Sequence, residues 1–142
     1  MSNTASCELC MQPGGAVLWQ DRRCRVVLVD DPAYRGFCRV IWNAHVKEMT
    51  DLSANDRRHC MCIVFAVECV LRKLLRPEKI NLASLGNMTP HVHWHVIPRF
   101  LNDAHFPQPV WSRRRRAAPE HGAAPAIGRL RRSLAAEIAR TV

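Results

Sequence analysis

Three histidines alternate with apolar residues in the segment 91–97, HVHWHVI. Successive side chains of a β-strand point to opposite faces, so this spacing predicts a strand that carries His91, His93 and His95 on one face. Packing alone rarely places three imidazoles together, because each buried ring needs a hydrogen-bond partner. The histidine face is therefore the candidate reactive surface of the chain.

Two kinds of chemistry suit such a face. Neutral imidazole is a common metal ligand, and alternate strand positions can place two ring nitrogens on one ion, although three rings on a nearly straight strand could not easily share it. In the other chemistry, one imidazole attacks an electrophile while its neighbours fix its tautomer and donate protons. The groups that surround the strand must decide between them.

Two cysteines near the start of the chain offer a separate candidate site. Cys7 and Cys10 form a Cys-x2-Cys pair, the spacing at which two thiolates bind one zinc ion, but no second such pair completes a four-sulfur site. The alternative is two unpaired thiols. A redox pair is disfavoured because we expect no helix start after the pair to lower a thiolate pKa.

The elements that position these residues begin with three short β-rich runs, residues 16–20, 25–30 and 37–42, separated by turn signals. They predict an antiparallel meander. Residues 79–85 form a further candidate strand, and the histidine strand follows it and ends before Pro98.

A long helix is predicted between Ser53 and Pro77. Ser53 can cap its start, with Asp56 at the capping-box spacing. Apolar residues recur three and four positions apart along it, which predicts one stripe facing a sheet. The stripe consists of Cys60, Ile63, Val64, Val67, Leu71, Leu74 and Leu75.

The chain after residue 105 has a different composition. Residues 106–111 are expected to be extended, residues 113–116 are four arginines, and residues 117–125 have the composition of a flexible linker. A final helix over 126–140 would align Ile127, Leu130, Leu134 and Ile138, and it could pack on the body, pack on a partner subunit or fray. We therefore divide the chain into a domain over 1–112 and a basic linker with a helical tail over 113–142.

Composition restricts the class of protein. The 142 residues suit one domain, and the net charge of +9 lies mostly in residues 113–142, which leaves +3 on residues 1–112. That tail lacks aromatic residues that would stack on bases, so we expect only nonspecific attraction to nucleic acid. No signal peptide or membrane span is recognisable, and seven cysteines suit reduced thiols, so we expect a cytoplasmic protein without a membrane partner.

The segment 91–97 resembles the signature of the histidine-triad family of nucleotidyl hydrolases and transferases, in which three histidines alternate with hydrophobic residues. The resemblance extends to His45 after its β-run, to the long helix and to the Ile97-Pro98-Arg99 exit. Residues 81–111 are especially similar to bacterial members often described as diadenosine tetraphosphate hydrolases.

The resemblance implies an α+β fold with a five-stranded antiparallel sheet, a long central helix and a further C-terminal helix, usually as a homodimer. It implies an enzyme that binds a nucleotide and needs no cofactor for the chemistry. His93 would attack the α-phosphorus and form a nucleotidyl-histidine, His95 would assist the leaving group, and His91 and His45 would support them.

Other residues are assigned with the same resemblance in view. Many relatives carry a hydroxyl-bearing loop before the triad, where this chain has residues 87–90, NMTP. Asn87, Asn81 and Ser84 could contact the substrate there, or they could be turn and strand-end polar groups.

The resemblance also implies a structural zinc site, because some relatives complete the N-terminal pair with two histidines, here His45 and His91 beside Cys7 and Cys10. Three functions remain open: hydrolysis of dinucleoside polyphosphates, phosphoramidase action on nucleotides, and a zinc-stabilised nucleotide-binding interaction module with little turnover.

Overall fold

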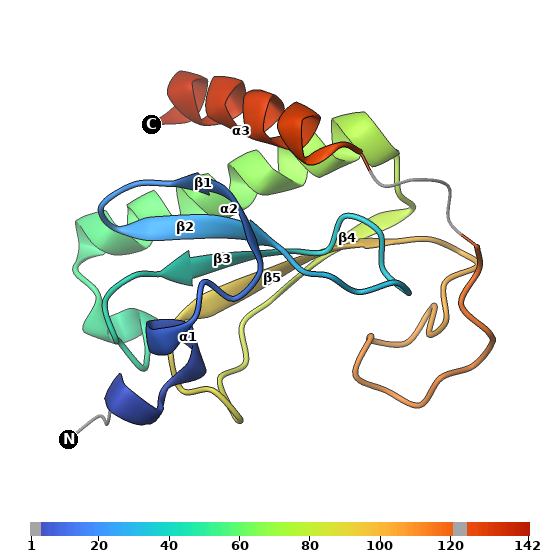
Figure 1. The fold of residues 1–142 in the computed structure, drawn as a ribbon, viewed down its shortest axis with the longest axis horizontal. Coiled ribbons are helices and arrows are strands. Elements are labelled where there is room, and N and C mark those ends of the chain that lie inside the picture. Colours follow the sequence, from blue (N-terminus) through green and yellow to red (C-terminus); the bar gives the residue numbers. More distant parts are fainter. Residues whose placement is uncertain (1–3, 121–124) are drawn as a thin grey trace.

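The computed structural model describes residues 4–120 and 125–142. Its centre is an antiparallel sheet of five strands in the order β1-β2-β3-β5-β4, which confirms the predicted sheet (Figure 1). The first three strands form the expected meander. The strands are β1 (Ala16–Gln20), β2 (Cys24–Leu28), β3 (Cys38–Trp42), β4 (Lys79–Ala83) and β5 (His93–Arg99).

Two long helices cover one face of this sheet. Helix α2 (Ala54–Leu75) begins at Ser53, whose hydroxyl accepts the Asp56 N–H at 3.1 Å, and it ends where Arg76 takes a left-handed φ of 48°. Helix α3 (Ile127–Thr141) lies beside α2 and over β1 (Figure 1). The main hydrophobic core lies between these helices and the sheet.

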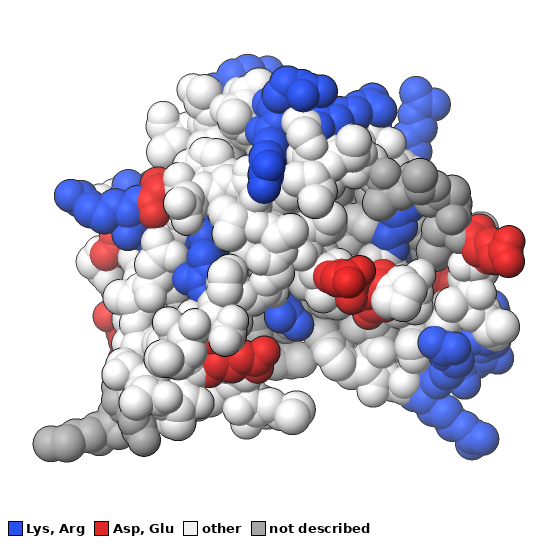
Figure 2. All heavy atoms as spheres, viewed as in Figure 1, with Lys and Arg blue, Asp and Glu red and all other residues white. Residues whose placement is uncertain are grey.

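The tail helix packs on the body rather than fraying. Leu130 and Leu134 are fully buried in the main core, while Ile127 at its start is exposed. The Glu137 carboxylate accepts hydrogen bonds from Lys73 of α2 and from Arg140. Figure 2 shows basic side chains over α3 at the top, over the segment after β5 at the lower right, and in a further group at the left edge.

Among the described residues, the opposite face of the sheet carries short elements near the chain start, the 3-10 turn η1 (Thr4–Ser6) and helix α1 (Glu8–Met11). The 3-10 turn η2 (Met49–Asp51) precedes α2, and its Met49 packs against the main core. Leu9 of α1 packs with Val27 and Ile41 in a small separate apolar cluster. Helix α1 begins directly after Cys7, so the expectation that no helix start follows the cysteine pair was wrong.

The histidine strand is shifted from its expected position. It begins at His93 rather than His91. The Val92 carbonyl still accepts from Trp42 at the end of β3, but the Val92 N–H donates to Val46 in the connection after β3. It continues through Pro98, where we expected it to have ended. Beyond Val96 only β4 pairs with it, so the missing proline N–H breaks no ladder bond on the β3 side.

Residues 106–111 form turns and are not extended as expected. The Asp103 carboxylate accepts the backbone N–H groups of His105 and Phe106, and the Gln108 N–H returns to the His105 carbonyl. These hydrogen bonds form the turns that replace the expected extended segment. The expected linker over 117–125 lies partly outside the described residues.

All seven cysteines are free thiols, and Cys24, Cys38 and Cys60 are completely buried. Within the described parts of the chain, no helix has the length and apolar character needed to cross a membrane.

Candidate functional site

β5 places two of the three histidines on the sheet face that the long helices leave free. The alternation holds through the strand: Val96 faces the main core, while the rings of His93 and His95 lie next to each other with centroids 4.9 Å apart. Both imidazoles are mostly buried. The structure thus brings together the two residues to which the sequence assigned the chemistry.

The geometry of His93 fixes its tautomer. Its Nδ1 lies 2.6 Å from the His91 carbonyl oxygen, and a carbonyl only accepts, so Nδ1 carries the proton and Nε2 keeps its lone pair. Burial lowers the pKa of His93, which outweighs the opposing effect of that hydrogen bond. A neutral ring with a free Nε2 is the form that can act as a nucleophile.

His95 sits in a ring of aromatic contacts. Its ring centroid is 5.1 Å from Trp111 and 5.7 Å from Phe37. Burial, together with nearby His93 and Arg39, lowers the pKa of His95 to about 4. His95 is therefore neutral at physiological pH and can offer a hydrogen bond, but it is a weak proton donor.

The third histidine of the motif belongs to a different cluster. Nδ1 of His91 faces two sulfurs, at 3.4 Å from Cys7 Sγ and 3.5 Å from Cys10 Sγ, and Cys10 Sγ lies 3.2 Å from His45 Nδ1. One donor atom from each of these four residues lies within 4.8 Å of all the others. The structure thus brings together the four residues predicted to bind zinc.

The four donors fit a tetrahedral zinc ion. With ordinary Zn–S and Zn–N bond lengths, sulfur and nitrogen ligands of one ion stand about 3.5 Å apart, close to the separations found here. The Nε2 of His91 donates to the Trp42 carbonyl at 2.5 Å, which leaves Nδ1 unprotonated and ready to ligate. Burial and the neighbouring Cys7 raise the pKa of the Cys10 thiol, so a bound cation would favour its thiolate form.

The same contacts occupy both nitrogens of His91. Burial lowers its pKa and outweighs the hydrogen bond to Trp42. What His91 gives directly to the neighbouring site is its backbone carbonyl, the acceptor that orients His93.

The other predicted substrate residues lie in different places. Ser84 donates its hydroxyl to the His93 carbonyl at 2.7 Å, and Asn81 accepts from Arg99 at 2.7 Å. Asn87 lines a surface cavity of about 960 Å³ together with His45, and neither His93 nor His95 is among its lining residues. The structure therefore does not group Asn87 with the reactive rings.

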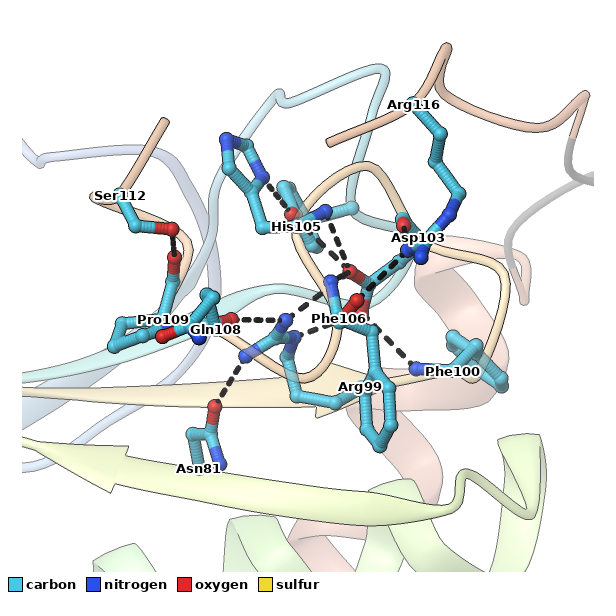
Figure 3. Close-up of polar contacts among 11 residues, drawn as sticks. Asn81, Arg99, Phe100, Asp103, His105, Phe106, Gln108, Pro109, Ser112 and Arg116 are labelled. Carbon is cyan, nitrogen blue, oxygen red and sulfur yellow. Dashed lines mark hydrogen bonds and ion pairs between the residues drawn. The ribbon is translucent and has the colours of Figure 1, made fainter. Parts of the chain in front are cut away.

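A buried ion pair at the end of β5 was missed by the sequence analysis (Figure 3). Arg99 bonds to Asp103 through two parallel contacts, Nε to Oδ2 at 2.8 Å and Nη2 to Oδ1 at 3.1 Å. Arg99 also donates to the Gln108 carbonyl at 2.7 Å, and Arg116 donates to the Asp103 carbonyl at 2.7 Å. The network holds the loop that carries Trp111 against His95. An arginine and an aspartate four residues apart were its only sequence signal.

A second convergent group, Asp21, Cys24 and His59, is explained by ordinary hydrogen bonds. One Asp21 oxygen accepts the N–H of Cys24 at 2.8 Å, and the other meets His59 Nε2 at 2.7 Å. The group ties the β1–β2 turn to α2.

A family model described as the HIT domain matches residues 12–102. A solved histidine triad protein from Bradyrhizobium japonicum is 24% identical, with a TM-score of 0.71 over 87% of this chain and 93% of that chain. One from Marinobacter aquaeolei is 21% identical, with a TM-score of 0.70 over 92% of this chain and 93% of that one. A Zn-bound histidine triad family protein from Mycobacterium smegmatis is 22% identical, with a TM-score of 0.63 over 97% and 96%. No curated protein matches the chain. These structural likenesses establish a shared fold.

Proposed function

The chain belongs to the HIT domain family, and from that premise we propose that it is a nucleotidyl hydrolase acting on the α-phosphate of dinucleoside polyphosphates. The observation that carries the proposal is the bond from His93 Nδ1 to the His91 carbonyl at 2.6 Å, which leaves Nε2 of a mostly buried, neutral ring free to attack.

In the first step His93 Nε2 bonds to the α-phosphorus, and the phosphorus–oxygen bond to the polyphosphate leaving group breaks, with the electron pair leaving on oxygen. In the second step the hydroxyl of a water molecule bonds to phosphorus and the phosphorus–nitrogen bond breaks, with its electron pair returning to His93 Nε2. Because Nδ1 has kept its proton, the imidazole departs as the neutral ring and the remaining proton of water is released to solvent, so the products are a nucleoside monophosphate and the free enzyme.

The state of His95 favours polyphosphate over amine leaving groups. An amine must be protonated to leave, whereas a polyphosphate departs as a stable anion. His95, with its pKa lowered to about 4 by burial, His93 and Arg39, can hydrogen-bond a departing oxygen but is a poor proton donor. This supports hydrolysis of dinucleoside polyphosphates over phosphoramidase action.

Zinc enters the proposal as a structural ion only. The four donors of Cys7, Cys10, His45 and His91 fit it, and the likeness to the Zn-bound Mycobacterium smegmatis protein supports it. A bound ion would tie the chain start to the segment before β5, close to the carbonyl that orients His93.

The test is to incubate wild type and His93→Ala with radiolabelled diadenosine tetraphosphate, quench in alkali and measure nucleotide attached to protein. Alkali preserves a phosphoramidate, so wild type should carry label and His93→Ala none. His105→Gln is the matched control, because it removes an imidazole that contacts Tyr34 and neither reactive ring, and it should label like wild type.

Turnover separates the remaining functions. Faster hydrolysis of an adenosine phosphoramidate than of the tetraphosphate would replace our proposal with phosphoramidase action. Tight nucleotide binding with no label and no turnover of either substrate would instead identify an interaction module.

A further inference from the structure

Three arginines lie on the sheet face that carries His93 and His95, and two of them find hydrogen-bond or charge partners within the protein. Arg25 donates to the carbonyls of Leu9 and Pro13 at 2.6 and 2.9 Å, and so holds the segment around α1. Arg99 is paired with Asp103. The third is Arg39 on β3.

Arg39 is left without comparable partners. Its Nη1 makes one long contact, 3.4 Å to the Gly14 carbonyl, and its guanidinium lies 5.9 Å from the Phe37 ring centroid. Its Nε is buried and has no hydrogen-bond partner, and among the described residues no carboxylate forms an ion pair with it. A buried N–H without an acceptor is costly unless a ligand supplies one.

The position of Arg39 links it to the reactive rings. It stands directly opposite His95 in the β3–β5 ladder and two pairs away from His93, which pairs with Ile41 on the same face. Side chains directly opposite each other on one face have Cβ atoms about 5 Å apart. Nδ1 of His95 is likewise buried without a partner, so two neighbouring residues each present an unused polar atom.

An anionic oxygen ligand satisfies this arrangement better than any neutral one. Guanidinium binds phosphate through charge-assisted hydrogen bonds, and Arg39 carries a permanent positive charge on the face that holds His93 and His95.

We propose that Arg39 binds the phosphate chain of the substrate and makes the site selective for nucleotides that carry several phosphates. This inference rests on the proposed function at His93 and names the residue that chooses its substrate class. A dinucleoside tetraphosphate places several negative charges near the nucleophile, whereas a nucleotide phosphoramidate places one. Loss of Arg39 therefore costs the first substrate more than the second.

The experiment compares Arg39→Met and Arg39→Lys with wild type on diadenosine tetraphosphate and adenosine phosphoramidate. Removal of one such donor costs roughly 100- to 1000-fold in rate, and we expect Arg39→Met to lose about that much kcat/KM on the tetraphosphate. On the phosphoramidate the loss should be under about tenfold, because less charge meets the guanidinium. Arg39→Lys keeps the positive charge but lacks the paired donors of guanidinium, so its kcat/KM on the tetraphosphate should lie between those of wild type and Arg39→Met.

Arg114→Met is the matched control. It removes the same charge from an exposed position in the arginine run and should stay near wild type on both substrates. An equal loss on the two substrates in Arg39→Met, or no loss on the tetraphosphate, would overturn the inference.

A binding arm keeps this result separate from the proposed hydrolysis and from any folding defect. Calorimetric titration of the folded fraction with ATP and with AMP should show a preference for ATP in wild type and Arg114→Met that shrinks in both Arg39 variants. Wild type that binds ATP in this way without hydrolysing the tetraphosphate would refute the hydrolase and leave the role of Arg39 standing. Equal ATP preference in all four proteins would refute the role of Arg39 alone.

Discussion

The two ends of β5 are held in opposite ways. Before its first residue, two thiols and two imidazoles, from Cys7, Cys10, His45 and His91, face one another in an arrangement that fits a metal ion. After its last residue, Arg99 and Asp103 satisfy each other, and neighbouring backbone groups fill the remaining positions (Figure 3). His93 and His95 lie between these two arrangements.

The contrast separates stability that the chain provides itself from stability that depends on a ligand. The Arg99–Asp103 network, at the closed end of the strand, contains its own opposite charges. It therefore holds the Trp111 loop under all conditions that keep Asp103 ionised. In the cluster of Cys7, Cys10, His45 and His91, at the open end, ionised thiols would repel one another, so we expect its contribution to stability to depend on a metal ion. Each end can therefore be weakened without changing the other.

The largest loss of stability should come from breaking the Arg99–Asp103 pair at the closed end. Asp103→Asn preserves the shape of the side chain but leaves Arg99 as a buried charge without its partner, and breaking such a pair costs about 3–5 kcal/mol of unfolding free energy. Denaturant unfolding followed by tryptophan fluorescence measures it, with the exposed Glu120→Gln as control. A loss below about 1 kcal/mol, comparable to an exposed ion pair, would show that the network does not hold the loop.

Zinc binding at the open end should stabilise the protein. Zinc added to metal-free protein at a hundred times its Kd should raise the free energy of unfolding by about 2.7 kcal/mol. Cys10→Ser should abolish that gain, whereas Cys62→Ser, which alters a thiol on α2, should keep it. The idea fails if protein purified without added metal holds less than about a tenth of an equivalent of zinc and added zinc does not stabilise it.

Lowering the pH should weaken the Arg99–Asp103 network, and the change in the free energy of unfolding should be smaller than in the two experiments above. Burial alone would raise the pKa of Asp103, but the hydrogen bonds from Arg99 and from backbone N–H groups lower it to about 2, from an ordinary value of 3.8. Because the folded pKa is depressed, the stabilisation is present above pH 3.8 and is lost as pH falls through 2. In metal-free protein the stability gap between wild type and Asp103→Asn should therefore shrink by about 2 kcal/mol over that range. A constant gap would contradict the assignment.

Much of the fold was predictable from the regular spacing of apolar residues within short segments. Alternation in segment 91–97 predicted that His93 and His95 share a face and that Val96 enters the core, and the three- and four-residue spacing predicted the buried stripe of α2. The strand's limits were not predictable, because before His93 the Val92 N–H bonds to Val46 in the connection after β3, a partner distant in sequence.

The site was predictable where residue type alone signals chemistry. The cysteines and histidines were recognised by type, and their convergence followed the family resemblance. Arg39 was not recognised, because an arginine in a β-rich run looks the same whether it faces solvent or a reactive ring. The Arg99–Asp103 network was missed because a turn, formed by the same aspartate, folds the following residues back over the strand.

The bond from Arg116 to the Asp103 carbonyl and the burial of Leu130 and Leu134 have a practical consequence for work with shortened chains. A protein that stops at residue 112 would lose an anchor of the loop beside His95 and two core side chains along with its basic charge. The influence of that charge on polyanion affinity is better measured in the 142-residue chain, by replacing Arg113, Arg114 and Arg115 with glutamine.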